Sequence, residues 1–399
     1  MSATFVPDSD RRAKANVARL AIAVALAGAN SSAIFATGSI VGSQMAADQG
    51  LATVPLSVFV LGMAAGTLPA GWIARRYGRK VAFVAGTGFG CLFGLTAALA
   101  IVVNSLPLFC LATFFGGLYG AVAQSYRFAA ADGASAAFLP KAVSWVMAGG
   151  VFAGVLGPQM VTFTMNGWPP YLFAASFLTQ AAAALVAMAV VSTVDLPKPT
   201  AIDSAGARPL ADIIIRPAFV MAALCSVVAY VLMNLVMTSA PLAMKICGFF
   251  PQDSNFVIQW HVVAMYAPSF VTGSLIGRIG ARAVVAAGLA IIAAAALLNL
   301  TGISLAHFAI GLVLLGVGWN FAFVGASAMV LEAHRPCERN KVQAFNDFLV
   351  FGTMAAGSFS SGQLLAVYGW SSVNWVVFPP VALALCILAL ARQRGQAPA

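Results

Sequence analysis

The segment AGWIARRYGRK, residues 70–80, lies between two long apolar runs and decides how the rest of the sequence is interpreted. It gathers positive charge around two glycines: Arg75, Arg76, Arg79 and Lys80, with Gly71 and Gly78. The chain around it has 399 residues, of which 61% are hydrophobic and only 8% are charged. Because soluble domains carry about 25% charged residues, we expect these apolar runs to lie in a lipid bilayer.

The apolar runs are long enough to cross the hydrocarbon core of a membrane, which takes about 20 residues. Backbone groups in lipid must be hydrogen-bonded within the segment, so each run is predicted to be a helix and the fold class is an all-α membrane protein. The twelve predicted spans are 17–41, 51–73, 81–103, 106–130, 141–165, 168–192, 217–243, 255–277, 282–303, 306–331, 341–366 and 371–391.

The longest polar stretch, 195–216, contains proline, glycine and charge, which exclude a span. It divides the chain into an N-terminal six-helix bundle (1–194), a cytoplasmic linker (195–216) and a C-terminal six-helix bundle (217–399).

The positive charges predict how the chain is oriented. Of 21 Lys and Arg residues, nineteen fall at the termini, in the even-numbered loops or in the linker; Lys245 lies in an odd-numbered loop, and Arg127 in or near the fourth span. Since cytoplasmic loops are rich in Lys and Arg, we expect both termini in the cytoplasm and the protein in the cytoplasmic (inner) membrane. The net charge of +10 does not indicate nucleic-acid binding, because these charges sit in short loops between apolar runs.

The basic segment has a second copy. GWIARRYGRK (71–80) returns as GSLIGRIGAR (273–282), so that, at an offset of 202, Gly71, Arg76, Gly78 and Lys80 match Gly273, Arg278, Gly280 and Arg282. At an offset of 200, Tyr119, Asp132 and Lys141 match Trp319, Glu332 and Lys341. Parallel repeats of this kind, related by an axis along the membrane normal, are typical of transporters with a solute site near mid-membrane between the repeats.

Twelve spans arranged as six plus six, with a Gly-x-x-x-x-Arg-x-Gly-Arg-Lys loop after the second, resemble the major facilitator superfamily over nearly the whole chain. The resemblance implies a secondary transporter that moves a small organic solute by alternating access. It also implies a chain that works as a monomer in the lipid bilayer, without a cofactor or a nucleic-acid partner.

The resemblance further implies a gate, in which a loop arginine pairs with an acid at the end of the fourth span and holds the cytoplasmic side closed. The candidate pairs are Arg76 or Arg79 with Asp132, and Arg278 or Arg282 with Glu332. The alternative is that these charges only anchor the loops. The candidate gate residues are thus both copies of the basic loop with their glycines, the two acids and Asp347.

One position departs from the family pattern. Arg75 stands where the family has an acid, and its counterpart in the second half is Gly277. Asp347 in the eleventh span is the acid available to it, so a charge-swapped Arg75–Asp347 contact is a hypothesis.

A charge inside a span is a functional hypothesis by default. Arg127 either extends to the headgroups or faces a central cavity as a cation for the solute. His261 is either a neutral buried histidine or a protonation site. Further candidates for solute binding are Asn30, Tyr119, Gln124, Tyr126, Asn234, Trp319 and Asn320. Aromatic walls with neutral hydrogen-bonding groups favour an uncharged or amphipathic organic solute.

Several alternatives stay open. No acid lies in the middle of a span, so proton coupling would use Asp347 or His261, or the protein is an uncoupled facilitator. A membrane receptor or scaffold with a transporter fold is another reading. Export of an amphipathic compound and uptake of a nutrient or vitamin are both compatible with the sequence, and a riboflavin-type flavin is one candidate, from the aromatic residues and Arg127. HExxH, GxSxG and P-loop patterns are absent, so we expect neither an enzyme nor a metal site.

Overall fold

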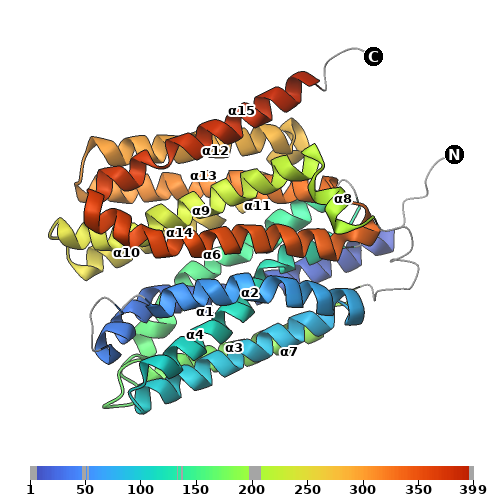
Figure 1. The fold of residues 1–399 in the computed structure, drawn as a ribbon. Helices are drawn as coiled ribbons and strands as arrows, with labels where there is room; N and C mark the ends of the chain where they lie inside the picture. The colour runs from blue at the N-terminus through green and yellow to red at the C-terminus, as the bar shows by residue number, and fades with distance from the viewer. Residues whose placement is uncertain are drawn as a thin grey trace.

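The computed structural model describes residues 7–46, 51, 54–132, 134–135, 138–196 and 208–394, and within them the regular structure is helical. The helices lie side by side along one long direction (Figure 1). They are α1 (Pro7–Met45), α2 (Val54–Tyr77), α3 (Arg79–Val102), α4 (Leu106–Gln124), α5 (Tyr126–Ala129), α6 (Leu139–Thr164), α7 (Ala174–Ser192), α8 (Leu210–Ile214), α9 (Pro217–Ile246), α10 (Pro251–Tyr266), α11 (Ser269–Ile279), α12 (Ala281–Thr301), α13 (Leu305–Glu332), a 3₁₀ turn (Pro336–Glu338), α14 (Arg339–Trp375) and α15 (Phe378–Arg394).

The predicted all-α membrane fold is confirmed. Eleven helical stretches in the described ranges are long and apolar enough to cross a membrane. The predicted span 341–366 is not among the stretches found within the described residues, and part of it, within 359–366, lies outside the residues whose side chains are described. The predicted span 168–192 begins later, at Ala174, because Phe173 directly before it has a left-handed backbone conformation (φ 68°) that an α-helix cannot include.

Two predicted spans are broken in the structure. The span 106–130 is α4 followed by the single turn α5, with the break at Ser125. The span 255–277 is α10 followed by α11, with the break at Ala267 and Pro268, where proline cannot continue the hydrogen-bond ladder. The first of these breaks positions the candidate site.

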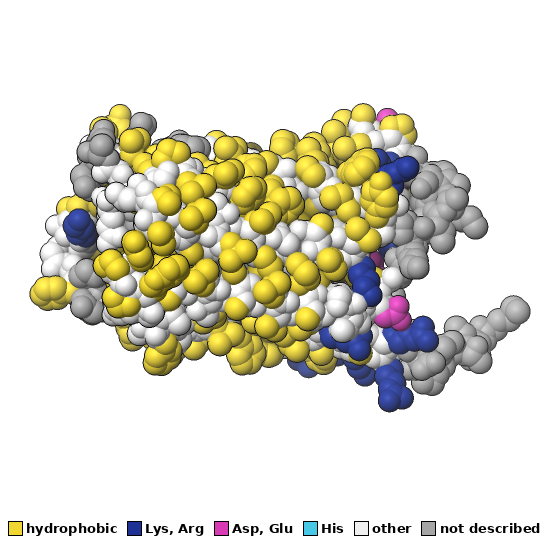
Figure 2. Space-filling view, turned by 90° about the horizontal axis from the view of Figure 1, so that it is seen from below, with side chains coloured by type: hydrophobic (Ala, Val, Ile, Leu, Met, Phe, Trp, Pro, Cys, Tyr) yellow, Lys and Arg dark blue, Asp and Glu magenta, His cyan; other side chains and the backbone are white. Residues whose placement is uncertain are grey.

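The side of the molecule seen in Figure 2 is mostly apolar, and most of the charged side chains in that view gather at one end. Large side chains such as Leu185 and Phe270 are more than half exposed, which suits contact with lipid rather than water. We call the charged end the basic end; it includes the ion-paired residues Arg79, Asp132 and Arg339 and the neighbouring Glu338.

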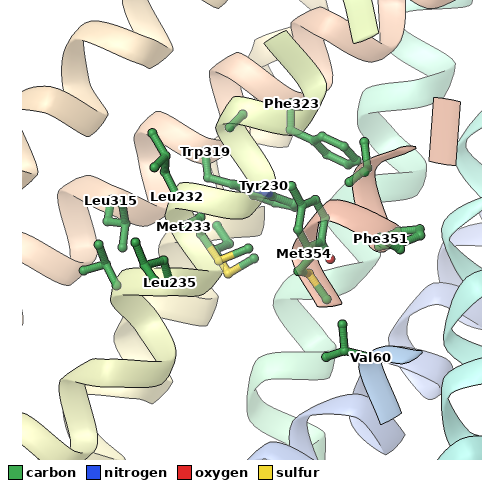
Figure 3. Packing of buried hydrophobic residues seen from close by; sticks show 14 of the residues in the cluster. Val60, Tyr230, Leu232, Met233, Leu235, Leu315, Trp319, Phe323, Phe351 and Met354 are labelled. Carbon is green, nitrogen blue, oxygen red and sulfur yellow. The ribbon is translucent and has the colours of Figure 1, made fainter. Parts of the chain in front are cut away.

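The helices form two packed groups. Helices α1–α4, α6 and α7 pack against one another, and α9–α15 form the second group. The groups meet where α2 packs on α14 and where α6 packs on α10 and α11. Buried side chains continue across the first contact, from Val60 on α2 to Phe351 and Met354 on α14 (Figure 3).

The two repeat-related glycines, Gly71 and Gly273, lie at these crossings. A Cβ on Gly71 would stand 2.4 Å from the Cβ of Ala344 on α14, and one on Gly273 would stand 2.6 Å from the carbonyl oxygen of Pro140 on α6. Both glycines are therefore needed for close approach between the two groups. The second crossing is also hydrogen-bonded, since the N–H of Gly273 donates to Ser144 Oγ at 2.9 Å.

Candidate functional site

A charged network joins the two helix groups at the basic end. Arg79, at the start of α3, forms an ion pair with Asp132 (Nε–Oδ2, 2.8 Å) and donates to Gln343 Oε1 on α14 at 2.7 Å. The other carboxylate oxygen of Asp132, Oδ1, pairs with Nη1 of Arg339 on α14 at 3.2 Å. Arg79 and Asp132 are both buried at the side chain. Asp132 thus pairs with one arginine from each helix group. We call Arg79, Asp132, Arg339 and Gln343 the end network.

The second predicted pair is not formed. Glu332, Arg278 and Arg282 are all exposed, and no ion pair joins them in the described ranges. The reason lies in the repeat: the position that matches Arg79 at the offset of 202 is Ala281. The prediction of a second Arg–Glu332 pair was therefore wrong. Arg76 is also exposed and lies against the ring of Tyr77.

Deeper in the molecule, Arg127 is almost completely buried, with 1% of its surface exposed. Its Nη2 pairs with Asp347 Oδ1 on α14 at 2.5 Å, and Asp347 is 3% exposed. Nε donates to Ser327 Oγ at 3.3 Å, and Nη1 donates to Gln124, to both its carbonyl oxygen and Oε1. An ion pair so deeply buried is costly unless every donor is satisfied, and here each nitrogen of the guanidinium has a partner.

The contact with Ser327 locates this pair in the fold. Arg127 and Ser327 are 200 residues apart, which is the offset that relates the two repeats. Two repeat-equivalent residues can touch only near the axis that relates their halves. The Arg127–Asp347 pair therefore lies close to the pseudo-twofold axis, between the helix groups.

The break after α4 explains why Arg127 points inward. The helix ends at Gln124, the N–H of Ser125 donates to Val122 O, and Arg127 lies on the separate turn α5. This geometry excludes the extension of Arg127 to the headgroups. The proposed Arg75–Asp347 contact was also wrong, because Arg75 is exposed at the end of α2 while Asp347 is buried against Arg127.

Aromatic side chains of the second helix group form a cluster that reaches this pair through Phe323. The ring centroid of Tyr230 on α9 lies 5.5 Å from that of Trp319, 5.0 Å from that of Phe323 and 5.4 Å from that of Phe351 (Figure 3). Trp319 stacks on Phe323 and contacts Tyr266. We call Tyr230, Tyr266, Trp319, Phe323 and Phe351 the aromatic cluster.

Polar atoms connect the aromatic cluster to the ion pair. The guanidinium of Arg127 lies 4.8 Å from the ring centre of Phe323, within cation–π range. Gln124 Nε2 donates to the hydroxyl of Tyr230 at 3.3 Å. Within the described part of the chain, the buried Nε1–H of Trp319 has no hydrogen-bond partner. The arrangement places aromatic rings, which are buried and packed on one another, beside one cation, one carboxylate and one donor without a partner. Groups of these kinds together can bind a planar ligand with a polar edge.

A family profile described as Major Facilitator Superfamily matches residues 20–250 and 222–399. The chain belongs to the Major Facilitator Superfamily. The Riboflavin transporter RfnT of Brucella anthropi is 44% identical over 382 residues, which cover 95% of this chain and 96% of that protein. An uncharacterized MFS-type transporter of Bacillus subtilis, YdeG, is 29% identical and is matched over 83% of its length.

Solved structures show the same superfamily fold. The proton:xylose symporter XylE superposes with a TM-score of 0.80 at 13% identity, covering 96% of each chain. The human organic anion transporter MFSD10 gives 0.74 at 15% identity, covering 94% of this chain and 99% of that one. This Major Facilitator Superfamily chain is a transporter and not an enzyme.

The remaining candidates for solute binding have different surroundings in the structure. Asn320 donates to Met265 O and Ser269 Oγ and accepts from Thr272, so its side chain ties α13 to α10 and α11. His261 Nδ1 bonds to the carbonyl of Leu312 at 2.6 Å. Four others are buried, but no hydrogen bond or ion pair joins their side chains to the Arg127–Asp347 pair in the described ranges: Asn30, Tyr119, Tyr126 and Asn234. Of the predicted set, Gln124, Arg127 and Trp319 come together.

One buried acid at the basic end was not predicted. Glu338 is bound by Arg208, whose Nε and Nη2 reach its two carboxylate oxygens at 2.6 Å each, and by the N–H of Arg335 at 2.9 Å. These hydrogen bonds, those from Arg208 first, hold the pKa of Glu338 at about 2, below its ordinary value of 4.5. Lys341 also donates to the carbonyl of Arg208. The end of the linker is thereby fastened to the start of α14.

Glu338→Ala is expected to lower the thermal unfolding temperature of the detergent-purified protein on the order of 5 °C, because Arg208 and the N–H of Arg335 lose their acceptor. Since the folded-state pKa of Glu338 is depressed, its stabilisation is present above the unfolded-state pKa and is lost as the pH falls from 4.5 toward 2. Differential scanning fluorimetry checks this, with the exposed acid variant Glu332→Gln as control. Equal unfolding temperatures for Glu338→Ala and wild type at pH 7 would contradict it.

Proposed function

We propose that this transporter carries a riboflavin-type flavin across the cytoplasmic membrane. The observation that carries the proposal is the aromatic cluster beside the Arg127–Asp347 pair, between the helix groups. The 44% identity to a protein named as a riboflavin transporter supports it. A flavin has a large flat ring system with hydrogen-bonding atoms along one edge, and aromatic rings bind such a surface by offset or edge-to-face stacking.

We further propose that the end network is the gate on the cytoplasmic side. Asp132 joins Arg79 of the first helix group to Arg339 of the second, so separating the groups at this end requires breaking a partly desolvated contact. Residues 1–194 and 217–399 would then move as two domains joined by the linker 195–216. This proposal includes termini in the cytoplasm, as the Lys and Arg distribution favours, and a single chain as the working unit.

If protons move with the solute, Asp347 is the group that we propose to carry them. Its carboxylate lies between the domains and faces Arg127, so protonation removes the charge that holds the pair together. His261 is less suited, because its Nδ1 is held by a backbone carbonyl within the second domain. Flavin accumulation driven by an imposed pH gradient in proteoliposomes would support coupling, whereas unchanged accumulation would make the protein an uncoupled facilitator.

The direct test is uptake of radiolabelled riboflavin in a bacterial strain that can neither synthesise nor import it. Cells that express the protein should accumulate the label and grow on low riboflavin, unlike cells with an empty vector. Flux into proteoliposomes separates a carrier from a receptor, which would bind riboflavin without moving it. Failure to bind or move riboflavin, with export of an amphipathic compound instead, would overturn the proposal.

Tyr230→Leu is expected to raise the KM for riboflavin about tenfold with a smaller change in the maximal rate. The leucine keeps apolar volume but removes one stacking surface and the hydroxyl that Gln124 contacts, worth about 0.5–1.5 kcal/mol for each aromatic pair. The control is Phe308→Leu, which removes another buried ring, one that packs on Phe249 and Trp370 outside the cluster. Equal KM values for the two variants would place the flavin elsewhere.

A further inference from the structure

The Arg127–Asp347 pair sets a hydrogen-bond donor group and an acceptor group side by side at the edge of the aromatic cluster. We propose that this pair is the specificity element of the site and binds the neutral imide edge of the flavin ring, the sequence carbonyl, N–H, carbonyl. Arg127 would donate to a carbonyl, and Asp347 would accept from the imide N–H. This inference rests on the proposed function and names the groups that would distinguish the flavin ring from other planar ligands.

The atoms needed for this recognition are available. Oδ1 of Asp347 holds Arg127 and also accepts from Asn346 Nδ2 at 3.1 Å, while no hydrogen bond to Oδ2 is recorded in the described ranges. Asp347 also lines a small cavity with Ser125, Phe128 and Gln343. The second carboxylate oxygen is therefore an acceptor that a ligand N–H can use without displacing Asn346.

Arg127 is placed to serve the same ligand edge. Its guanidinium lies over Phe323, which stacks on Trp319 and contacts Tyr230. A ring that binds along these aromatic faces would bring its edge toward the guanidinium. The bond from Nη1 to Gln124 Oε1 is long, at 3.3 Å, and is the one most easily exchanged for a ligand carbonyl.

The pairing of charges selects the class of ligand. An anionic group at this edge would be repelled by Asp347, and a cationic group by Arg127. A neutral edge with an N–H between two carbonyls satisfies both residues, whereas an apolar edge leaves both buried charges without new partners when the pair opens. Sites built around such groups discriminate strongly against analogues that lack the matching hydrogen bond.

The same contacts connect recognition to movement. Arg127 belongs to the first domain and Asp347 to the second, so the pair is a direct bond between the parts that must separate. A ligand that takes over the hydrogen bonds of both residues compensates for the opening of the pair. An analogue that can occupy the aromatic cluster but not the pair is expected to bind weakly and to remain untransported.

The test compares riboflavin with N3-methylriboflavin, which has the same ring but no imide N–H. Binding to purified protein in nanodiscs is followed by flavin fluorescence. Wild type should bind the methylated analogue at least tenfold more weakly. In Asp347→Ala this difference should disappear, because the acceptor is gone; in Asp347→Asn, whose amide oxygen still accepts, part of it should remain. The control Asp195→Asn alters an exposed acid that is not part of the Arg127–Asp347 pair, and it should keep the full difference in affinity between the two flavins.

The outcomes separate this inference from the proposed function. Equal affinity of wild type for the two flavins would overturn the inference, as would an undiminished difference in Asp347→Ala, while riboflavin binding itself would leave the proposed function standing. Failure of wild type to bind riboflavin would reject the proposed function. If Asp347→Ala does not fold, the wild-type comparison and Asp347→Asn still decide.

Discussion

Asp347→Leu is expected to reduce riboflavin transport by about 100-fold or more and to destabilise the protein. The substitution leaves the guanidinium of Arg127, which is 1% exposed, without its counter-charge. Removing one partner of a buried ion pair costs about 3–5 kcal/mol. Transport in cells and thermal unfolding of the purified variant measure the two effects separately.

The double variant Arg127→Met, Asp347→Leu distinguishes a structural role of the pair from a functional one. Replacing both charges by apolar side chains of similar size is commonly neutral or stabilising, so the unfolding temperature should return close to that of wild type. Transport should remain lost, because the donor and the acceptor are both gone. Recovery of transport in the double variant, or normal transport in the single one, would show that the pair serves only to hold the fold.

Gly71→Ala is expected to shift the transporter toward conformations that are open at the basic end, with transport lowered roughly tenfold or more. The new Cβ would stand 2.4 Å from the Cβ of Ala344, a separation that methyl groups do not tolerate, so α2 and α14 could not close as they do here. Labelling of a cysteine introduced at Ser125, which lines the cavity behind the end network, should become faster in a cysteine-free background.

Two further glycines make this experiment specific. Gly273→Ala places a Cβ 2.6 Å from Pro140 O at the other crossing, so it should act in the same direction. A Cβ on Gly277 meets nothing within 4 Å, and Gly277→Ala should therefore label and transport like wild type. Unchanged labelling in Gly71→Ala, or an equal effect in Gly277→Ala, would contradict the assignment of Gly71 to closure.

Sequence patterns predicted the parts of this protein that depend on local composition. Long apolar runs predicted the helices, and the duplicated basic loop predicted the superfamily fold. The pairing of Arg79 with Asp132 was among the predicted contacts because each lies at a recognisable helix end. The same logic failed for Glu332, since the arginine that should meet it is replaced by Ala281.

The centre of the site depended on features that the sequence does not display. The Arg127–Asp347 contact requires a helix break at Ser125 and the approach of α14 from the other helix group. Tyr230, Phe323 and Phe351 are aromatic residues in apolar runs, where residues that face lipid, core and ligand look alike. Glu338 lies in a short charged turn, and only the folded linker reveals Arg208 as its partner.

Helix α14 contributes residues to all three parts of the proposed site. Arg339 and Gln343 belong to the end network, Asp347 to the ion pair and Phe351 to the aromatic cluster. Consecutive members are four residues apart, so they follow one face of the helix over roughly 18 Å. Because one continuous helical segment carries residues of the end network, the ion pair and the aromatic cluster, a tilt of this segment moves all three together. No loop has to transmit the movement from one to another.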